Sequence, residues 1–299
     1  MSKVAIKAIY CPVRVNLLGG WTDQETWPEM GAVSNVAIGW PKAYRGQYPL
    51  MMDHCGVLRS KIEGYGSGLG ISSILLALKE IRKKPESLKG DPTHIILKVL
   101  KEERAISQGG WQDQIGGIIP GVKLTVTSDH RKFHIRSKPF HPALEHMIVF
   151  DTGHRRPSAY IGDRIRELID VHNPQFFKHM RRIAFEAIRT FDDKRPEEMI
   201  LSSLESWEKL LKFVPQIAIP INLPRLPARI VHGSYLTGAG GGGFGITWVK
   251  DPGYRDQVIM AYSQVGIWAT VPIVINSGPL VIYLRKRDRG LLSKCPLFI

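Results

Sequence analysis

The chain has 299 residues, of which 43% are hydrophobic and 23% are charged, a composition typical of globular proteins that excludes a wholly disordered chain. No uncharged apolar run approaches the roughly 18 residues of a membrane-spanning helix, and the first apolar stretch lacks the features of a signal peptide. The 41 basic and 27 acidic residues give a net charge of +14, which fits a nucleic-acid partner, a small polyphosphate or simply a basic surface and does not separate the three.

The first half of the chain begins with strand patterns and becomes helical after a glycine-rich loop. Residues 4–18 are rich in Val, Ile and Leu, which favours one or two strands, with a turn at Pro12. After residue 70, apolar residues recur at helical spacing. The elements expected here are, in order, strands over 4–18, 32–38 and 57–62, helices over 71–83 and 92–107, and strands over 121–127 and 132–137.

The second half opens with a buried strand over 146–150 and is helical in its middle. A proline-rich stretch over 215–227 predicts a loop or a short broken helix. The other expected elements are helices over 158–171, 175–191 and 197–213, a strand over 244–249, a helix over 254–265, and strands over 271–275 and 280–285. This order predicts a two-part α+β protein, with one domain over 1–140 and a second over 141–299.

A glycine-rich loop, GYGSGLGISS over 64–73, stands directly before the first expected helix. Its backbone N–H groups and the helix N-terminus together suit a polyanion such as a phosphate chain. Ser72 and Ser73 fit either a metal ion or a helix cap, so a glycine turn with a serine cap is an equal alternative. The loop lacks the lysine of a Walker motif.

A second glycine-rich segment, GGWQDQIGG over 109–117, holds Asp113 between two glutamines. Glycine pairs lose much conformational entropy on folding, so they indicate a close approach of the backbone to another group. Asp113 is a candidate general base held among amide donors. The alternative is that it caps the helix or turn that follows.

Two further segments, one near each end of the chain, also combine glycine with polar residues. RVNLLGGWTD over 14–23 presents Trp21 and Asp23 after a strand, and a tryptophan beside a carboxylate suits a sugar, although a surface hairpin tip is the alternative. TGAGGGGFG over 237–245 is too rich in glycine for a helix or a good strand. We expect a packed loop on the phosphate side there rather than a flexible linker.

In this order, the four segments resemble the motifs of GHMP-family small-molecule kinases, which are named for galactokinase, homoserine kinase, mevalonate kinase and phosphomevalonate kinase. The resemblance is carried by RVNLLGGWTD at 14–23, GSGLGISSIL at 66–75, GGWQDQIGGIIPGVK at 109–123 and HGSYLTGAGGGGF at 232–244. The GGWTD turn and GGWQDQ favour the branch formed by the kinase portion of L-fucokinase over the galactokinases, which have a GEHTD turn.

The resemblance implies the two-part GHMP kinase fold, with an N-terminal ribosomal-protein-S5-like domain that carries the phosphate loop 64–73 and a C-terminal α/β sandwich. It also implies ATP-dependent phosphorylation of a sugar hydroxyl, from L-fucose to L-fucose 1-phosphate, with Mg²⁺ as cofactor. A heptose-phosphate kinase is one alternative. Another is a truncated kinase-fold binding protein that is weak or inactive, because the segment 24–63 is shorter than in fucokinases.

Carried over residue by residue, the resemblance implies a role for each motif. Asp113 would be the catalytic carboxylate, and Arg14 would stabilise charge or orient it. Ser72 and Glu102 would hold the metal ion. The residues implied to bind ATP are Gly66, Ser67, Gly68, Leu69, Gly70, Ser72, Ser73, Gly240 and Gly241. Those implied to bind the substrate are Trp21, Asp23, Gly238 and Gly242.

The partners expected are therefore ATP and a sugar. Few of the basic residues lie in the predicted phosphate loops and no nucleic-acid recognition motif is present, so we expect no nucleic-acid partner and no membrane partner. Three distant cysteines without a CxxC pair argue against a disulfide framework and a zinc site and fit a cytoplasmic protein. The oligomeric state stays open.

Overall fold

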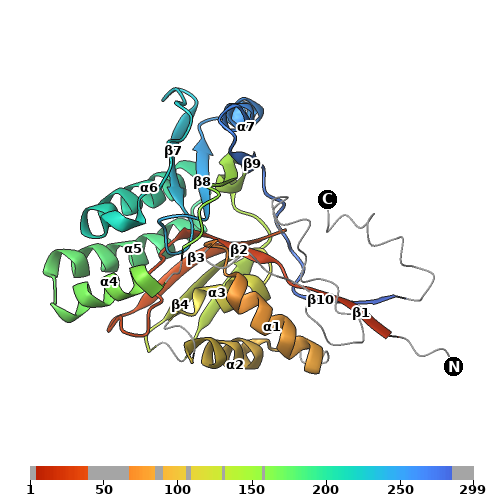
Figure 1. Ribbon diagram of the computed structural model, residues 1–299. Coiled ribbons are helices and arrows are strands. Elements are labelled where there is room, and N and C mark those ends of the chain that lie inside the picture. The colour runs from red at the N-terminus through yellow and green to blue at the C-terminus, as the bar shows by residue number, and fades with distance from the viewer. Residues whose placement is uncertain are drawn as a thin grey trace.

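The computed structural model describes residues 5–39, 67–84, 90–105, 109–129, 132–156 and 159–284. Within these ranges the chain forms helices α1–α7 and three antiparallel sheets (Figure 1). The strand predicted over 57–62 and Gly66 of the predicted phosphate loop lie outside the described residues.

The first large sheet has the strand order β2-β3-β4-β5, formed by Val13–Leu18, Gly31–Ile38, Val122–Thr127 and His134–Lys138. Every residue of β2 and β3 is buried, whereas the edge strand β5 has exposed positions. Because successive side chains of a strand point to opposite faces, both faces of the sheet centre must be covered.

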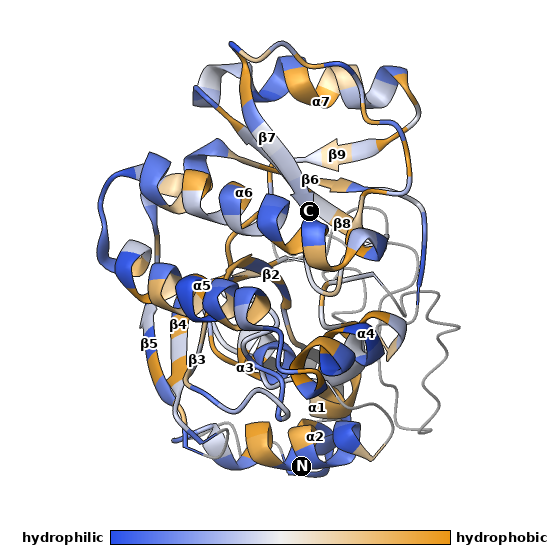
Figure 2. Ribbon diagram, turned by 90° about the vertical axis from the view of Figure 1, so that its left-hand side faces the viewer, coloured by the Kyte–Doolittle hydropathy of each residue, from blue (hydrophilic) through white to orange (hydrophobic). Residues whose placement is uncertain are grey.

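Helices supply this cover on both sides (Figure 1). On one side lie α1 (Ile71–Lys83), α2 (Thr93–Arg104) and α3 (Gln112–Ile118), of which α3 contacts β2 and β3. On the other side lie α4 (Ala159–Asp170), α5 (Pro174–Asp192) and α6 (Pro196–Phe213). Hydrophilic and hydrophobic residues alternate along α4–α6 (Figure 2), as expected of helices with one buried face.

The second large sheet has the order β7-β8-β6-β9. Its strands are β6 (Met147–Asp151), β7 (Val231–Leu236), β8 (Phe244–Val249) and β9 (Trp268–Thr270), and α7 (Arg255–Gln264) packs against it. A separate antiparallel pair joins β1 (Ala5–Tyr10) to β10 (Leu280–Leu284), so the first and last described strands lie side by side.

One hydrophobic core passes through both sheets, since Val15 of β2, Ile183 of α5 and Ile246 of β8 belong to the same buried cluster. Helix α6 connects the halves by packing on both β2 and β7. The change of sheet falls between Lys138 and Met147, close to the predicted boundary at residue 140. The division into two domains stays a prediction. No helix in the described ranges is long and apolar enough to span a bilayer.

The helices predicted from periodicity are confirmed, and α1 has the predicted bounds. Two strands differ from the prediction. The strand predicted over 271–275 is wrong: β9 ends at Thr270, and residues 271–275 make only one isolated bridge, between Ile38 and Val274. Pro272 has no N–H to donate to a continuous ladder. Strand β7 was not predicted, because VHGSYL has neither strict alternation nor a run of β-branched residues.

Candidate active site

Helix α3 holds Asp113 against Arg14 of β2. Asp113 lies in the first turn of α3, whose cap is Trp111, so Asp113 is not the helix cap. Arg14 donates from Nε to Asp113 Oδ1 over 2.9 Å and from Nη2 to the same oxygen. The Arg14 side chain is 3% exposed and that of Asp113 is 26% exposed. A buried guanidinium thus fixes a carboxylate whose second oxygen, Oδ2, accepts no hydrogen bond from the described residues.

The glycines around Asp113 allow this contact. A Cβ at Gly116 would lie 2.6 Å from Arg14 Cβ, and a Cβ at Gly110 would lie 1.8 Å from Asp23 Oδ2. The predicted close approach of the backbone is therefore to the side chains of Arg14 and Asp23. Buried Lys123 supports the far end of α3 by donating to the carbonyl oxygens of Gly116 and Gly121 over 2.9 and 3.0 Å. Burial lowers the Lys123 pKa well below its ordinary value.

A second carboxylate, Glu103, connects α2 to the start of α1. Its Oε1 accepts from Ser72 Oγ over 2.7 Å, and its Oε2 accepts from Ser73 Oγ and Gln114 Nε2. Burial, and next the charge of Asp113, raise the Glu103 pKa.

Glu102 was predicted to hold the metal ion together with Ser72, but in the structure it is Glu103 that contacts the Ser72 hydroxyl. The Glu102 side chain is 30% exposed and pairs with Lys79 at 3.7 Å. One residue is about 100° around a helix, which turns Glu102 away from the serines.

The described part of the predicted phosphate loop, Ser67–Gly70, joins the two halves of the molecule. Gly70 is the N-cap of α1, and the carbonyl of Gly68 accepts from Arg14 Nη1 over 2.6 Å. A Cβ at Gly68 would lie 2.3 Å from the Thr237 carbonyl oxygen, and one at Gly238 would lie 2.7 Å from Gly68 Cα. The predicted phosphate loop and the predicted substrate loop are thus in backbone contact.

Asp23 lies beneath this cluster with no exposed surface. Its two oxygens accept from the backbone N and the side-chain Nε2 of Gln112, over 3.2 and 3.3 Å. Burial, and next the charge of Asp113, raise the Asp23 pKa to about 6. The predicted role of Asp23 in binding sugar hydroxyls stays a prediction, and in this structure its carboxylate is occupied by Gln112.

The loop of four glycines, 240–243, is packed rather than free. Gly241 N donates to Ile217 O over 2.8 Å and Gly243 N donates to His154 O over 2.7 Å. Arg156, which follows β6, donates from Nη2 to Gly240 O. The packing confirms a folded loop instead of a linker, while the ATP contacts of Gly240 and Gly241 and the substrate contact of Gly242 stay predictions.

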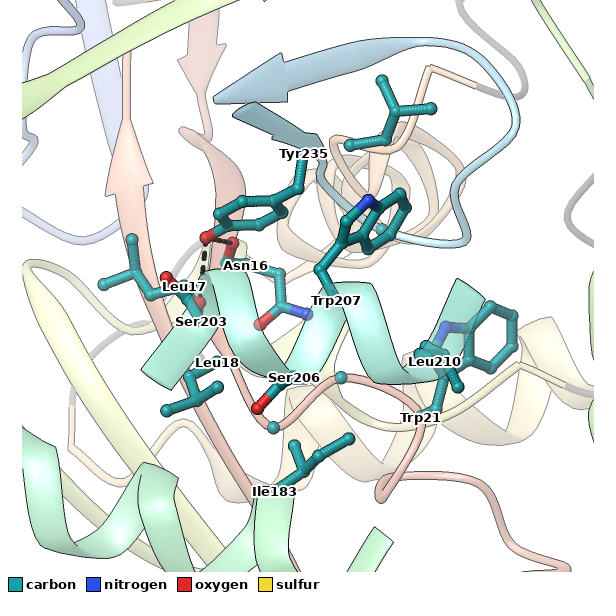
Figure 3. Close-up of a pocket in the computed structure, with 14 residues that line it drawn as sticks. Asn16, Leu17, Leu18, Trp21, Ile183, Ser203, Ser206, Trp207, Leu210 and Tyr235 are labelled. Atoms are coloured by element: carbon teal, nitrogen blue, oxygen red, sulfur yellow. Dashed lines mark hydrogen bonds between the residues drawn. The ribbon is translucent and has the colours of Figure 1, made fainter. Parts of the chain in front are cut away.

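A pocket opens between β2, α6 and the Thr237–Gly238 turn, and it contains Trp21 and Gly238 of the predicted substrate set (Figure 3). Its empty space, counting the open mouth, is about 390 Å³. The predicted site residues do not include Asn16, Trp207 or Tyr235, which line it as well. Trp207 and its neighbours on α6 carry no local signal, because an aromatic residue on an amphipathic helix ordinarily belongs to the core.

Comparisons with known proteins agree with this geometry. No protein-family model matches the chain. The bifunctional fucokinase/GDP-fucose pyrophosphorylase of Arabidopsis thaliana is 24% identical over 201 residues, which are 62% of this chain and 19% of that protein. The chain therefore spans about a fifth of the length of this relative.

Solved structures match over nearly the whole chain at low identity. Lactococcus lactis galactokinase in complex with galactose covers 94% of this chain and 96% of its own, with 16% identity and a TM-score of 0.55. The D-glycero-D-manno-heptose 1-phosphate kinase of Bacteroides thetaiotaomicron covers 93% and 99%, with 16% identity and a TM-score of 0.57. Streptococcus pneumoniae phosphomevalonate kinase with phosphomevalonate and AMPPNP covers 90% and 100%, with 16% identity and a TM-score of 0.61.

The fold is that of the GHMP kinases. In this GHMP fold, the residues predicted for catalysis and the described part of the phosphate loop come together, since Arg14 contacts both Asp113 and Gly68. The described residues contain no cluster of three or more His, Cys, Asp or Glu side chains suited to a metal ion. Mg²⁺ commonly needs only one or two protein carboxylates because substrate phosphates and waters complete its shell.

The donor atoms near Glu103 fit such an ion. Besides the Glu103 carboxylate and the Ser72 hydroxyl, the side-chain oxygen of Gln114 is buried and has no hydrogen-bond partner among the described residues. All are hard oxygen donors of the kind that Mg²⁺ prefers. These residues therefore fit a magnesium ion that arrives with a nucleotide.

Proposed function

We propose that this protein is an ATP-dependent sugar kinase that phosphorylates the anomeric hydroxyl of L-fucose to give L-fucose 1-phosphate in the cytoplasm. The observation that carries the proposal is the Arg14–Asp113 pair beside Glu103 and the glycine loop. Phosphoryl transfer needs a positioned carboxylate, a metal site and donors around the phosphates, and the residues of this cluster support an assignment of these three roles. The choice of L-fucose is supported by the fucokinase-like GGWTD and GGWQDQ segments.

In the proposed mechanism, ATP phosphates lie on the backbone of Ser67–Gly70 at the N-terminus of α1, where amide groups favour anions. Asp113 Oδ2 accepts the proton of the sugar hydroxyl while that oxygen forms a bond to the γ-phosphorus. The bond between the γ-phosphorus and the bridging oxygen to the β-phosphate breaks, and ADP leaves. Arg14 keeps the Asp113 carboxylate aligned during the transfer. Glu103 and Ser72 would hold Mg²⁺, which neutralises charge on the phosphates when bound.

The direct test measures ADP release with Mg·ATP and, in turn, L-fucose, D-galactose and a heptose phosphate. We expect turnover with L-fucose and a loss of about 10²-fold or more in Asp113→Asn, the range typical of a removed general base. Asp192→Asn is the matched control. Asp192 is an exposed carboxylate that pairs with Arg136 and lies far from Asp113 in the sequence. Turnover with the heptose phosphate alone would show that the substrate is a heptose phosphate and not L-fucose. No turnover with any sugar and no thermal shift with Mg·ATP would leave a non-catalytic kinase-fold protein.

A further inference from the structure

Helix α3 carries Asp113 but is a weak helix on its own. It has only seven residues, and two of them, Gly116 and Gly117, are glycines. Glycine is unfavourable inside a helix, and an isolated helix this short is not stable in water. Its N-cap, Trp111, has only a donor in its side chain. The N–H groups that are free at the start of α3, and the C=O groups that are free at its end, therefore need partners from other segments.

Asp23 supplies the partner at the start of α3. Its Oδ2 accepts from the backbone N of Gln112 over 3.2 Å, and its Oδ1 accepts from the Gln112 side chain over 3.3 Å. Gln112 is the first residue of α3 and stands directly before Asp113. A carboxylate in this place acts as a helix cap, although it comes from a segment 89 residues earlier in the sequence.

The same packing shields Asp23 from a ligand. Asp23 has no exposed surface, and a Cβ at Gly110 would lie 1.8 Å from its Oδ2 and 2.8 Å from its carbonyl oxygen. Asp23 is not among the described residues that line the pocket between β2 and α6. A sugar hydroxyl would reach this carboxylate only if the backbone of 109–112 moved. The geometry therefore favours a helix cap over a sugar ligand.

Lys123 and Cys11 supply partners at the end of α3. Lys123 Nζ donates to Gly116 O over 2.9 Å and to Gly121 O over 3.0 Å, which connects the last turn of α3 to the residue before β4. Cys11 Sγ donates to Gly117 O over 3.3 Å. Both side chains are buried, where hydrogen bonds are stronger than in water. The end of α3 is thus held to two neighbouring segments.

Arg14 lies against the middle of α3, between these two ends. A Cβ at Gly116 would lie 2.6 Å from both Cβ and Cγ of Arg14, so the helix backbone rests directly on the Arg14 stem. Arg14 Nε donates to Asp113 Oδ1 over 2.9 Å. Asp113 and Gly116 are three residues apart and share one side of the helix. A tilt of α3 at either end would therefore change the contact of Asp113 with Arg14 and displace Asp113 Oδ2.

We infer that Asp23 and Lys123 are positioning residues, which hold α3 from its two ends and so place Asp113 against Arg14 for the reaction. Asp23 then acts as a helix cap and not as the ligand of sugar hydroxyls that the resemblance implies. The effect on turnover rests on the proposed function. The hold on α3 is a property of the protein without substrate, so it is measured separately.

The first measurement is backbone hydrogen exchange of the segment 109–120 by mass spectrometry, without any ligand. Asp23→Ala removes the acceptor at the start of α3, and Lys123→Met removes the donor at its end. Each variant should speed exchange of this segment, relative to α5, by about fivefold or more, the effect of one lost hydrogen bond. Asp23→Asn keeps an acceptor oxygen for Gln112 N and should exchange like the wild type.

Glu80→Ala is the matched control for a buried carboxylate. Glu80 is 6% exposed and pairs with Lys83 of α1 and Lys98 of α2. Lys138→Met is the control for the lysine, because Lys138 Nζ donates to the carbonyl of Phe191 on α5. Neither control should change the exchange of 109–120.

The second measurement is kcat and KM for sugar phosphorylation. Asp23→Ala and Lys123→Met should each lower kcat by about tenfold or more, because a small displacement of a reacting group is enough for losses of about 10²-fold. The KM for the sugar should stay within about threefold, and Asp23→Asn should keep the wild-type kcat. A sugar ligand predicts the other division, with KM raised in both Asp23 variants and kcat less affected.

Unchanged exchange of 109–120 in both Asp23→Ala and Lys123→Met, or a sugar KM raised by about tenfold in Asp23→Asn, would overturn the inference. Unchanged exchange together with Asp113-dependent turnover would remove the inference and leave the proposed function standing. If the wild-type protein phosphorylates no sugar, the proposed function fails, and faster exchange in the two variants would still support the hold on α3. Lys123→Met and Asp23→Asn keep the test decisive if Asp23→Ala does not fold.

Discussion

Replacing Asp23 by asparagine should stabilise the protein at neutral pH. Asp23 has no exposed surface, and its pKa is raised from 3.8 to about 6. This rise means that ionisation of the carboxyl lowers the free energy of unfolding by about 3 kcal/mol. The new amide can still accept from Gln112 N, and it can donate to Gln112 Oε1, which has no partner in the wild-type protein among the described residues, if the Gln112 amide turns over.

The sign of the pH dependence follows from the same shift. Below about pH 4 the carboxyl is protonated in both states, and above about pH 6 it is ionised in both. Between these values the unfolded chain releases the proton first, so the contribution of Asp23 to stability falls as the pH rises. Relative to the wild type, Asp23→Asn should therefore gain stability from pH 4 to pH 6 and keep a constant advantage above it.

The assay is urea unfolding followed by circular dichroism at several pH values between 4.5 and 8, with the difference between variant and wild type plotted against pH. The plateau should be about 1–3 kcal/mol, below the full shift because the hydrogen bonds change. Asp193→Asn is the control of opposite sign, since Arg195 lowers the Asp193 pKa. A difference that does not vary with pH, or a wild type that is the more stable protein at pH 7.5, would refute the reasoning.

Three further predictions follow from other contacts. Gly68→Ala should lower both stability and nucleotide affinity, because its Cβ would lie 2.3 Å from Thr237 O at a φ of +75°; thermal unfolding with and without Mg·ATP measures both. The free energy of unfolding should rise as the pH approaches the ordinary pKa of lysine, because the unfolded chain binds the Lys123 proton more readily than the folded one. Lys123→Met should remove this pH dependence in urea unfolding between pH 7 and 9.5. Glu103→Gln should weaken Mg·ATP binding by about tenfold or more and leave binding of metal-free ATP nearly unchanged. Titration calorimetry with Mg²⁺ and, separately, in EDTA measures the two affinities. Equal losses in both titrations would argue that Glu103 does not hold the metal ion.

The sequence predicted the parts of the fold and site that depend on local pattern. Helix α1 follows from apolar spacing, and the glycine pairs around Asp113 predicted a close approach that the structure assigns to Arg14 and Asp23. The choice between Glu102 and Glu103 depends on how α2 is rotated against the serines of α1, and local spacing does not encode that rotation.

The full lining of the pocket between β2 and α6 was beyond sequence reasoning for a similar reason. Trp207 and Asn16 are 191 positions apart and become neighbours only because α6 packs on both β2 and β7. Each alone has an ordinary explanation, a helix tryptophan in a core or an asparagine in a strand. The unpaired Asn16 oxygen is visible only once the surrounding atoms are placed.

The contact between Gly68 and Gly238 leaves no room for a side chain on either residue, so a shift of one loop displaces the other. A nucleotide that orders Ser67–Gly70 should then also restrict the wall of the pocket that contains Gly238. By thermodynamic reciprocity, each ligand should tighten the other by the same factor. Under the proposed function, a nucleotide that binds first would therefore prepare the Gly238 side of the pocket before the acceptor arrives.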